Sequence, residues 1–179
     1  MQTSSQLSDV LEEREAPADF EAVFHQHYER IARAVARIVG DTGCAEELAI
    51  DAFWKFWQTP QAHGEKAVGW IYRTAINLGL YELRRRGRHA RFQRMLRLGG
   101  PATPEEIRSA DEEQEQVRRV LAHIRPRDAE LLLLRSNDFS YEELAAVLGL
   151  NPASVGTLIA RARLAFRKEY VRLYGEPRN

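Results

Sequence analysis

The sequence lacks several features that would place it in common functional classes. Its 179 residues include a single cysteine, Cys44, which excludes an internal disulfide and a cysteine-cluster metal site. No apolar run reaches the roughly 20 residues that a membrane-spanning helix needs. Residues 1–18 lack the basic start and apolar stretch of a secretory signal. We therefore expect a cytoplasmic protein without membrane insertion.

The chain also lacks net charge, because 26 basic residues balance 26 acidic ones. Taken whole, this balance argues against a general polyanion binder. The charge is unevenly placed, however: residues 1–69 carry −6, residues 70–98 carry +7, residues 99–153 carry −5 and residues 154–179 carry +4. Each basic block is either a candidate nucleic-acid surface or an ordinary solvated helix face.

Little in the sequence would form a β-sheet, because no strand alternation of useful length occurs. Apolar residues instead recur at intervals of three and four, which predicts an all-α fold. Gly40 is placed to end a first helix, and Asp41 or Thr42 is placed to cap a second that runs to Trp57. Residues 58–66 are expected to form a loop. Further helices are predicted from about Val68 into the arginine run and over residues 112–124, 127–136, 140–148 and 152–173.

One clear break divides the chain. A glycine–proline joint at residues 99–104 leads into an acidic stretch, a composition typical of an interdomain linker. We therefore expect two small helical domains, at residues 19–97 and 112–179, joined by a flexible linker at residues 98–111. Residues 1–18, which are acidic and broken by Pro17, are expected to form a disordered N-terminal tail.

The most informative stretch of the second domain predicts a helix-turn-helix. Ser140 and Glu143 have the spacing of a capping box. Gly149 then allows a sharp turn, and Asn151 with Pro152 is typical of the start of another helix. A short helix, a glycine-containing turn and a longer helix form the DNA-binding pattern, although an ordinary helical hairpin would share it.

The composition of the longer helix favours DNA binding. Its opening residues are small or hydroxylated, so the helix can lie close to base edges, and the arginines that follow can contact phosphates beside a major groove. We expect Leu158, Ile159, Ala162 and Phe166 to form its buried face. The candidate DNA-contacting residues are Ser154, Val155, Thr157, Leu158, Arg161, Arg163 and Arg167.

The first domain contains an aromatic segment at residues 45–57. Phe53 and Phe56 are expected in the core, but Trp54 and Trp57 cannot both share that face with every other apolar residue. Part of this helix should therefore be exposed, and an apolar patch rimmed by charge is a candidate protein-docking surface. The candidate docking residues are Glu46, Glu47, Asp51, Trp54, Lys55 and Trp57.

A second segment of the first domain, residues 69–94, combines aromatics, an amide and a dense arginine run. Aromatic faces can stack on unpaired bases while arginines follow the backbone. A basic helix lying on a membrane surface is the alternative, which fits poorly because the apolar residues are needed for the core. The candidate residues are Trp70, Tyr72, Arg73, Asn77, Arg84, Arg85 and Arg88.

These three motifs, in this order, resemble the extracytoplasmic-function (ECF) sigma factors, a class of the sigma-70 family of bacterial transcription initiation factors. The resemblance covers roughly residues 19–97, as the family's region 2, and residues 112–174, as its region 4. It implies that core RNA polymerase and promoter DNA are the partners. No cofactor, metal or catalytic residue is implied. An anti-sigma partner is usual in the family, and no residue of this sequence identifies one.

The resemblance also assigns a role to each segment. The docking residues of helix 45–57 would bind core polymerase. The loop at residues 58–68 and the helix at residues 69–88 would read and melt the minus-ten element, capturing a flipped base of the non-template strand. The residues of helix 152–168 would read the minus-thirty-five element. Two positions depart from the family pattern: Tyr81 stands where an acidic residue is common, and Ile159 where lysine is frequent. We therefore predict no promoter sequence.

Two other functional classes would each explain part of the sequence. A helix-turn-helix regulator that acts without polymerase would explain the second domain, but not segment 69–94. An enzyme could use the five histidines as bases or ligands, yet no nucleophile elbow, metal pair or phosphate loop accompanies them. These histidines are His25, His27, His63, His89 and His123.

Overall fold

The computed structural model of the chain describes residues 20–96 and 110–176, and within those ranges it contains seven α-helices and no strand. The predicted all-α fold is therefore confirmed. The expected N-terminal tail and most of the expected linker lie outside the described residues. No single described helix is long and apolar enough to cross a membrane. Only the last two helices together reach that length and composition, and the chain bends by 94° between them.

The first three helices form a bundle: α2 (Phe20–Val39), α3 (Thr42–Trp57) and the long α4 (Ala67–Leu96). As predicted, α2 ends at Gly40, which has a left-handed φ of 71°. Asp41 caps α3, its carboxylate accepting a hydrogen bond from the Cys44 amide at 2.9 Å. The expected loop at residues 58–66 contains one short 3₁₀ turn, Pro60–Ala62.

The core of this bundle comes from the apolar stripes of its three helices. Phe53 and Phe56 are both buried, as the sequence predicted. Their rings pack against Phe20 of α2, with centroids 6.3 Å apart in both pairs. Burying one such side chain contributes about 1.5–3 kcal/mol, so this stripe fixes how α2, α3 and α4 pack. Other fully buried members are Ile31, Val35, Ile38, Ile71, Ile76 and Leu80.

The last four helices are α5 (Ala110–His123), α6 (Pro126–Ser136), α7 (Tyr141–Leu148) and α8 (Pro152–Tyr174). Helices α5, α6 and α7 all pack on α8. The buried residues recur at helical spacing on each of these elements, which is the periodicity that the sequence showed. They include Val120, Leu134, Leu144, Val155, Ile159 and Ala162.

The turn between α7 and α8 has the predicted geometry. The Ser140 amide donates to the Glu143 carboxylate at 2.6 Å, and the Glu143 amide donates to the Ser140 hydroxyl at 3.2 Å, so the capping box is complete. Gly149 ends α7 with a φ of 62°, a conformation that glycine adopts without steric cost. The Asn151 side chain then caps α8 by accepting from the Ala153 amide at 3.0 Å.

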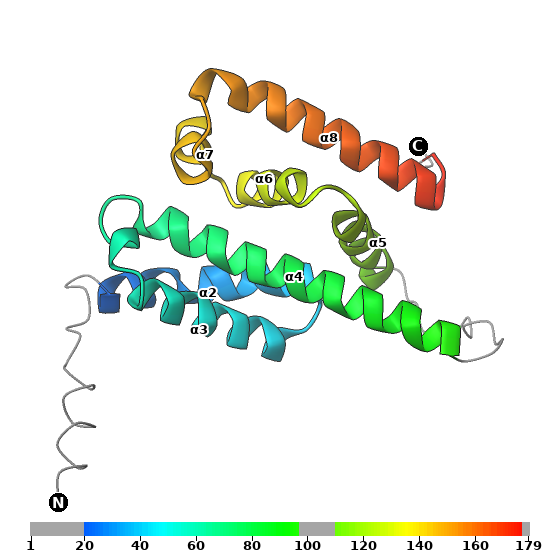
Figure 1. Cartoon of the computed structure of the whole chain (residues 1–179), viewed down its shortest axis with the longest axis horizontal. Coiled ribbons are helices and arrows are strands. Elements are labelled where there is room, and N and C mark those ends of the chain that lie inside the picture. Colours follow the sequence, from blue (N-terminus) through cyan, green and yellow to red (C-terminus); the bar gives the residue numbers. More distant parts are fainter. Residues whose placement is uncertain (1–19, 97–109, 177–179) are drawn as a thin grey trace, which may run out of the picture.

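The two groups of helices pack against one another, with α4 between them (Figure 1). One side of α4 faces α2 and α3, and the other contacts α5, α6 and α7. Buried apolar residues of both groups form one continuous core cluster. Sequence spacing had predicted two domains on a flexible connection. It could not reveal this contact, because the residues that meet lie far apart in the chain.

Candidate nucleic-acid and protein interfaces

An exposed aromatic surface lies on α3. Ile50 and Trp54 are each 52% exposed, although both are large apolar residues. The Trp57 ring lies beside the Trp54 ring, with centroids 4.8 Å apart. These three residues share one helix face, and we call them the α3 patch. The predicted exposure of part of this helix is confirmed. Exposed charged residues flank the patch: Glu46, Glu47, Asp51 and Lys55.

Sequence reasoning missed Ile50 as a member of the α3 patch. Ile50, Trp54 and Trp57 have the i, i+4 and i+7 spacing of one helix face. Helical periodicity in the sequence could therefore have identified Ile50. The opposite face of α3 is buried in the core of the bundle, and it carries Ala49, Phe53 and Phe56. The α3 patch is therefore what remains after the bundle has formed, and it suits a protein partner.

The candidate residues of α4 fall into two groups. Four of them contact the C-terminal helices or the turn between α6 and α7: Tyr72, Arg73, Asn77 and Arg84. Tyr72 is buried against Phe139, with ring centroids 5.2 Å apart. Its hydroxyl has no hydrogen-bond partner among the described residues. Burial raises the pKa of Tyr72, against the opposing effect of nearby arginines, of which Arg30 is the strongest.

Polar atoms of the other three residues are bound by groups from the C-terminal helices. Arg73 Nε and Asn77 Nδ2 both donate to Glu130 Oε1 at 2.8 Å. Arg84 donates to the backbone oxygens of Leu121 and Ala122 at 3.3 Å. These donors are the ones expected to contact DNA, and here they bind the chain itself.

The second group comprises Trp70, Arg85 and Arg88. Trp70 is half-buried against Phe56, with ring centroids 6.2 Å apart. Arg85 and Arg88 are exposed and line a shallow hollow together with His89 and Phe92. Cations beside an exposed aromatic ring suit a single-stranded nucleic acid. His89 and Phe92 are additions to the residues that the sequence analysis had selected.

Glu82 organises the arginines of this second half of α4. Its carboxylate accepts from Arg85 at 2.7 and 3.1 Å and from Arg86 at 2.8 Å. Hydrogen bonds from Arg85 and Arg86 lower the pKa of Glu82 to about 2 although burial opposes the shift. Glu82 therefore stays ionised at neutral pH, and it holds two cations at fixed positions on the helix.

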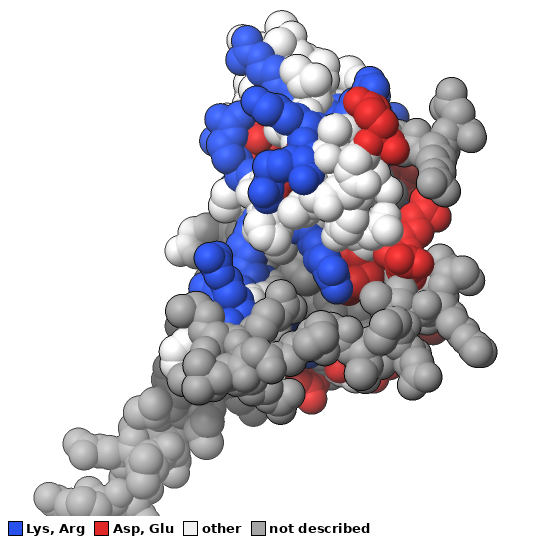
Figure 2. Space-filling model, turned by 90° about the vertical axis from the view of Figure 1, so that its right-hand side faces the viewer, with Lys and Arg blue, Asp and Glu red and all other residues white. Residues whose placement is uncertain are grey.

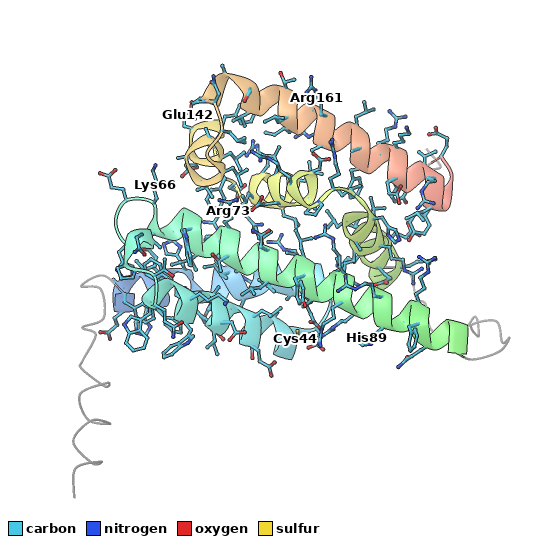
Figure 3. The ribbon with its side chains drawn as sticks, in the orientation of Figure 1. Cys44, Lys66, Arg73, His89, Glu142 and Arg161 are labelled. Atoms are coloured by element: carbon cyan, nitrogen blue, oxygen red, sulfur yellow. The ribbon has the colours of Figure 1, made fainter. Side chains whose placement is uncertain are left out.

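Four of the seven candidate residues of α8 are exposed, two are half-buried and one is buried. Thr157, Arg161 and Arg163 are exposed, and neither of these arginines forms an ion pair with a described residue. Arg161 points away from the rest of the molecule, whereas Arg73 lies between α4 and the C-terminal helices (Figure 3). Arg167, also exposed, lies 3.9 Å from the exposed Glu176. Leu158 and Ser154 are half-buried, and the Ser154 hydroxyl donates to the Asn151 backbone oxygen at 2.7 Å.

Val155 was misassigned as a DNA-contacting residue. Its side chain is fully buried, because residues 155, 159 and 162 form one apolar stripe on α8 that packs into the domain core. A side chain committed to this core cannot reach a base edge without unfolding the helix. Val155 is therefore not part of the DNA-facing surface of α8. Ile159 and Ala162, which were predicted to be buried, are confirmed as such.

Charge is gathered unevenly over the surface. Figure 2, which views the end of the molecule where α8 and α4 end, shows lysine and arginine side chains grouped over one part and acidic side chains along one side. The basic groups lie close enough together to attract a polyanion even though the whole chain is neutral.

The histidines do not converge on a common site. His63 and His123 contact backbone oxygens of Phe56 and Arg119 at 3.0 and 2.7 Å. His25 lies at the surface, 3.8 Å from Glu21. Burial and the nearby Arg30 lower the pKa of His27. Across residues 20–96 and 110–176, no three histidine, cysteine, aspartate or glutamate residues gather in a manner that could hold a metal ion.

Comparison with known proteins gives concordant results. Residues 23–89 match the family described as Sigma-70 region 2, and residues 114–166 match that described as Sigma-70, region 4. The chain is 27% identical to the ECF RNA polymerase sigma factor SigE of Mycolicibacterium smegmatis, over 92% of this chain and 66% of SigE. It is also 27% identical to the RNA polymerase sigma factor YlaC of Bacillus subtilis, over 88% of this chain and 95% of YlaC.

The fold is also found among solved structures. The sigma factor RpoE from Bartonella quintana, crystallised in complex with the anti-sigma factor NepR, superposes with a TM-score of 0.52. The match covers 84% of this chain and 96% of RpoE at 19% sequence identity. At that identity the likeness describes the arrangement of helices alone.

Proposed function

The chain belongs to the ECF group of the sigma-70 family, and we propose that it is an alternative sigma factor that directs core RNA polymerase to promoters and helps to open them. One observation carries the proposal: region 2 and region 4 of the family occur in order on a single chain, at residues 23–89 and 114–166. A regulator that acts without polymerase would need only the second of these regions.

We assign the binding of core polymerase to the α3 patch and its charged rim. Ile50 and Trp54 stay half-exposed beside the more deeply buried Trp57, at a cost in free energy that a protein partner would recover. Two neighbouring tryptophans at the centre of a patch are typical of binding hot spots. The residues assigned to this surface are Ile50, Trp54 and Trp57, together with Glu46, Glu47, Asp51 and Lys55.

Opened minus-ten DNA is assigned to α4. Trp70 and Tyr72 supply aromatic faces for unstacked bases, and Asn77 supplies an amide for a base edge. Arg73, Arg84, Arg85 and Arg88 supply cations for the strand backbone. Several of these groups are covered in the structure described above, so this assignment requires the C-terminal helices to move away from α4.

Duplex minus-thirty-five DNA is assigned to α8. The bend of 94° after α7 lets α8 enter a major groove with its first turns facing the bases. Ser154, Thr157 and Leu158 lie in those turns, and Arg161, Arg163 and Arg167 follow them toward the phosphates. Phosphate contacts of this kind give affinity, and contacts from the first turns give sequence preference.

A sigma factor is a regulatory subunit and carries no chemistry of its own, so we propose no catalytic residue, metal or cofactor. Its place would be the cytoplasm, because its polymerase and promoter partners are there. An anti-sigma partner is part of the proposal through the family alone, and no contact within this chain identifies such a partner.

Polymerase dependence tests the proposed function. The purified chain should co-elute with core polymerase from a sizing column and should give run-off transcripts from cognate promoters selected from a library of genomic fragments. No ATP-driven remodelling should be required. Specific binding to a palindromic duplex without polymerase would instead favour the regulator, and failure to co-elute with core enzyme would overturn the sigma-factor assignment.

A further inference from the structure

The face of α4 that is expected to bind opened DNA is occupied by another part of the same chain. Arg73 and Asn77 both donate to one carboxylate oxygen of Glu130, and Arg73 also donates to the Val147 backbone oxygen at 3.1 Å. Glu130 is only 6% exposed. A carboxylate that is buried to this extent needs cationic or hydrogen-bonding partners, and here α4 supplies them. The Glu130 carboxylate accepts from Arg73 in the way that a DNA phosphate would.

Apolar contacts reinforce this polar contact. Gly69 lies one turn before Arg73, and a side chain at residue 69 would collide with a methyl group of Val147. The absence of a side chain at Gly69 therefore allows α7 to approach α4 closely. Beside this contact, Tyr72 packs edge-on against Phe139, which lies in the turn before α7.

Further arginines of the N-terminal bundle bind the same C-terminal unit. Arg30 donates to the Asn137 backbone oxygen at 3.0 Å, and Arg37 donates to its side-chain oxygen at 3.2 Å. Asp138, also within reach of Arg30 at 3.4 Å, holds a left-handed φ of 69°, a conformation uncommon for a residue with a side chain. The turn after α6 is thus fixed against α2 while α6 and α7 cover α4.

We infer that α6, α7 and the turn between them cover the part of α4 formed by Tyr72, Arg73 and Asn77, which we call the minus-ten surface, and that this closed arrangement and the capture of opened DNA at that surface exclude each other. The inference rests on the proposed function. Arg73 and Asn77 cannot bind Glu130 and DNA with the same donors. Tyr72 cannot stack on a base while it is enclosed by Phe139. The partner that this surface fits before promoter opening is therefore the chain's own second domain.

A disulfide between α4 and α7 tests the closed arrangement directly. An ideal Cβ at residue 69 would lie 3.5 Å from Val147 Cβ, within the range of about 3.5–4.5 Å that disulfides require. We would introduce Gly69→Cys and Val147→Cys into the full chain after removing the native thiol by Cys44→Ser. The free protein should then crosslink under mild oxidation, measured by non-reducing electrophoresis and by counting free thiols.

The matched control places the first cysteine elsewhere on α4. Tyr81→Cys, combined with Val147→Cys and Cys44→Ser, adds an exposed thiol about 18 Å further along the helix, at 1.5 Å per residue. We expect the 69–147 pair to crosslink at least about tenfold faster than this control, because closure gives its thiols a high effective concentration. Equal rates for the two pairs would overturn the closed arrangement.

The same crosslink tests occlusion. A fluorescein-labelled single-stranded dT₂₀ oligonucleotide serves as the probe, and its fluorescence anisotropy reports binding to the free chain. The oxidised, locked chain should bind it several-fold more weakly than the reduced chain, because α4 is covered in one state and accessible in the other. Equal affinities would show that the second domain does not block the surface.

Glu130→Gln tests the role of the buried carboxylate without cysteines. It weakens the attachment of Arg73, so the free chain should bind dT₂₀ about fivefold more tightly, the gain expected from one released arginine–phosphate contact. Glu142→Gln is the matched control because it removes the same charge from an exposed position of α7. Equal gains for the two variants would mean that net charge alone is responsible, which refutes the inference.

These experiments test the closed arrangement independently of the proposed function. Crosslinking and dT₂₀ binding use the free chain and need no polymerase. A chain that crosslinks and responds as expected, but gives no transcript with core enzyme, would leave the closed arrangement standing and refute the sigma-factor assignment. The reverse result would refute the closed arrangement alone.

Discussion

The two basic helices, α4 and α8, have similar chemistry but different surroundings. On α8, Arg161 and Arg163 extend from the surface and form no ion pair with a described residue. On α4, Arg73 is bound to Glu130 of the other domain, and Arg85 is bound to Glu82 of its own helix. The helix proposed to read duplex DNA is therefore accessible, whereas the helix proposed to hold melted DNA is partly covered. This difference suggests an order in which duplex recognition does not require opening of the chain and strand capture does.

We expect the largest effect from reversing the charge of the accessible arginines of α8. Reversing two charges with Arg161→Glu and Arg163→Glu should weaken the binding of holoenzyme to a duplex minus-thirty-five element by about 100-fold, because a hydrogen bond between charged groups, such as an arginine–phosphate contact, contributes about 1.5–3 kcal/mol. Fluorescence anisotropy on a labelled duplex measures the change. Association with core polymerase should be unaffected.

A control for total charge accompanies this pair. Arg33→Glu and Arg127→Glu reverse two exposed arginines outside α8, so they alter the net charge equally. A comparable loss of duplex binding in the control would mean that the whole field, and not α8, determines affinity.

Trp54→Ala tests whether binding of core polymerase depends on the α3 patch and not on the DNA-binding helices. Removing a central aromatic residue from a docking patch should cost about 2 kcal/mol or more, which is about a 30-fold loss of core polymerase affinity. Binding of dT₂₀ by the free chain should not change. Tyr81→Ala is a suitable control, because Tyr81 is 62% exposed and lies off the α3 patch. If Tyr81→Ala were the more damaging of the two for core binding, the docking surface would have to be moved to α4.

Glu82→Gln tests how the arginines of α4 are held within their own helix. We expect the free energy of unfolding to fall by about 1.5 kcal/mol, at the lower end for hydrogen bonds to a charged group, as measured by urea denaturation. Glu29→Gln is the control, because it removes a carboxylate from a solvent-exposed pair with Arg33 on α2, which should cost almost nothing.

The same carboxylate predicts a dependence of stability on pH. The folded-state pKa of Glu82 is about 2, below its usual value of 4.5. Its contribution is therefore fully present above pH 4.5 and is lost as the pH falls toward about 2. The difference in stability between the native chain and Glu82→Gln should shrink over this window. A difference that grew on acidification would contradict the assigned cause.

We expect the smallest effects from removing helix caps, and these effects should be equal in the two domains. Asp41→Ala in the first domain and Ser140→Ala in the second should each destabilise the chain by about 1 kcal/mol, because each leaves a helix amide without its side-chain acceptor. Amide hydrogen exchange in α3 and α7 measures the local loss. Ser140→Asn, which keeps an acceptor, should restore most of the protection, and failure to do so would indicate that the cap is not the cause.

Much of this molecule could be predicted from local patterns. Gly40 and Asp41 identified a helix boundary, and Ser140, Glu143 and Gly149 identified the turn of the helix-turn-helix, because caps and turns depend on neighbours within a few residues. The exposure of Trp54 followed from helical periodicity. Val155 was misassigned because its position within the first turns of α8 suggested base contact, while its apolar stripe with residues 159 and 162 pointed inward.

What the sequence determined by itself is the set of helices, their caps, the order of the two family regions and the basic character of α4 and α8. These properties follow from interactions between residues close in the chain. Only the tertiary structure decided which of the cations are accessible. Arg73 and Glu130 are 57 residues apart, and Gly69 meets Val147 only after both domains have folded. Contacts of this kind depend on how completed helices pack, so the sequence showed the charges and the structure showed what they bind.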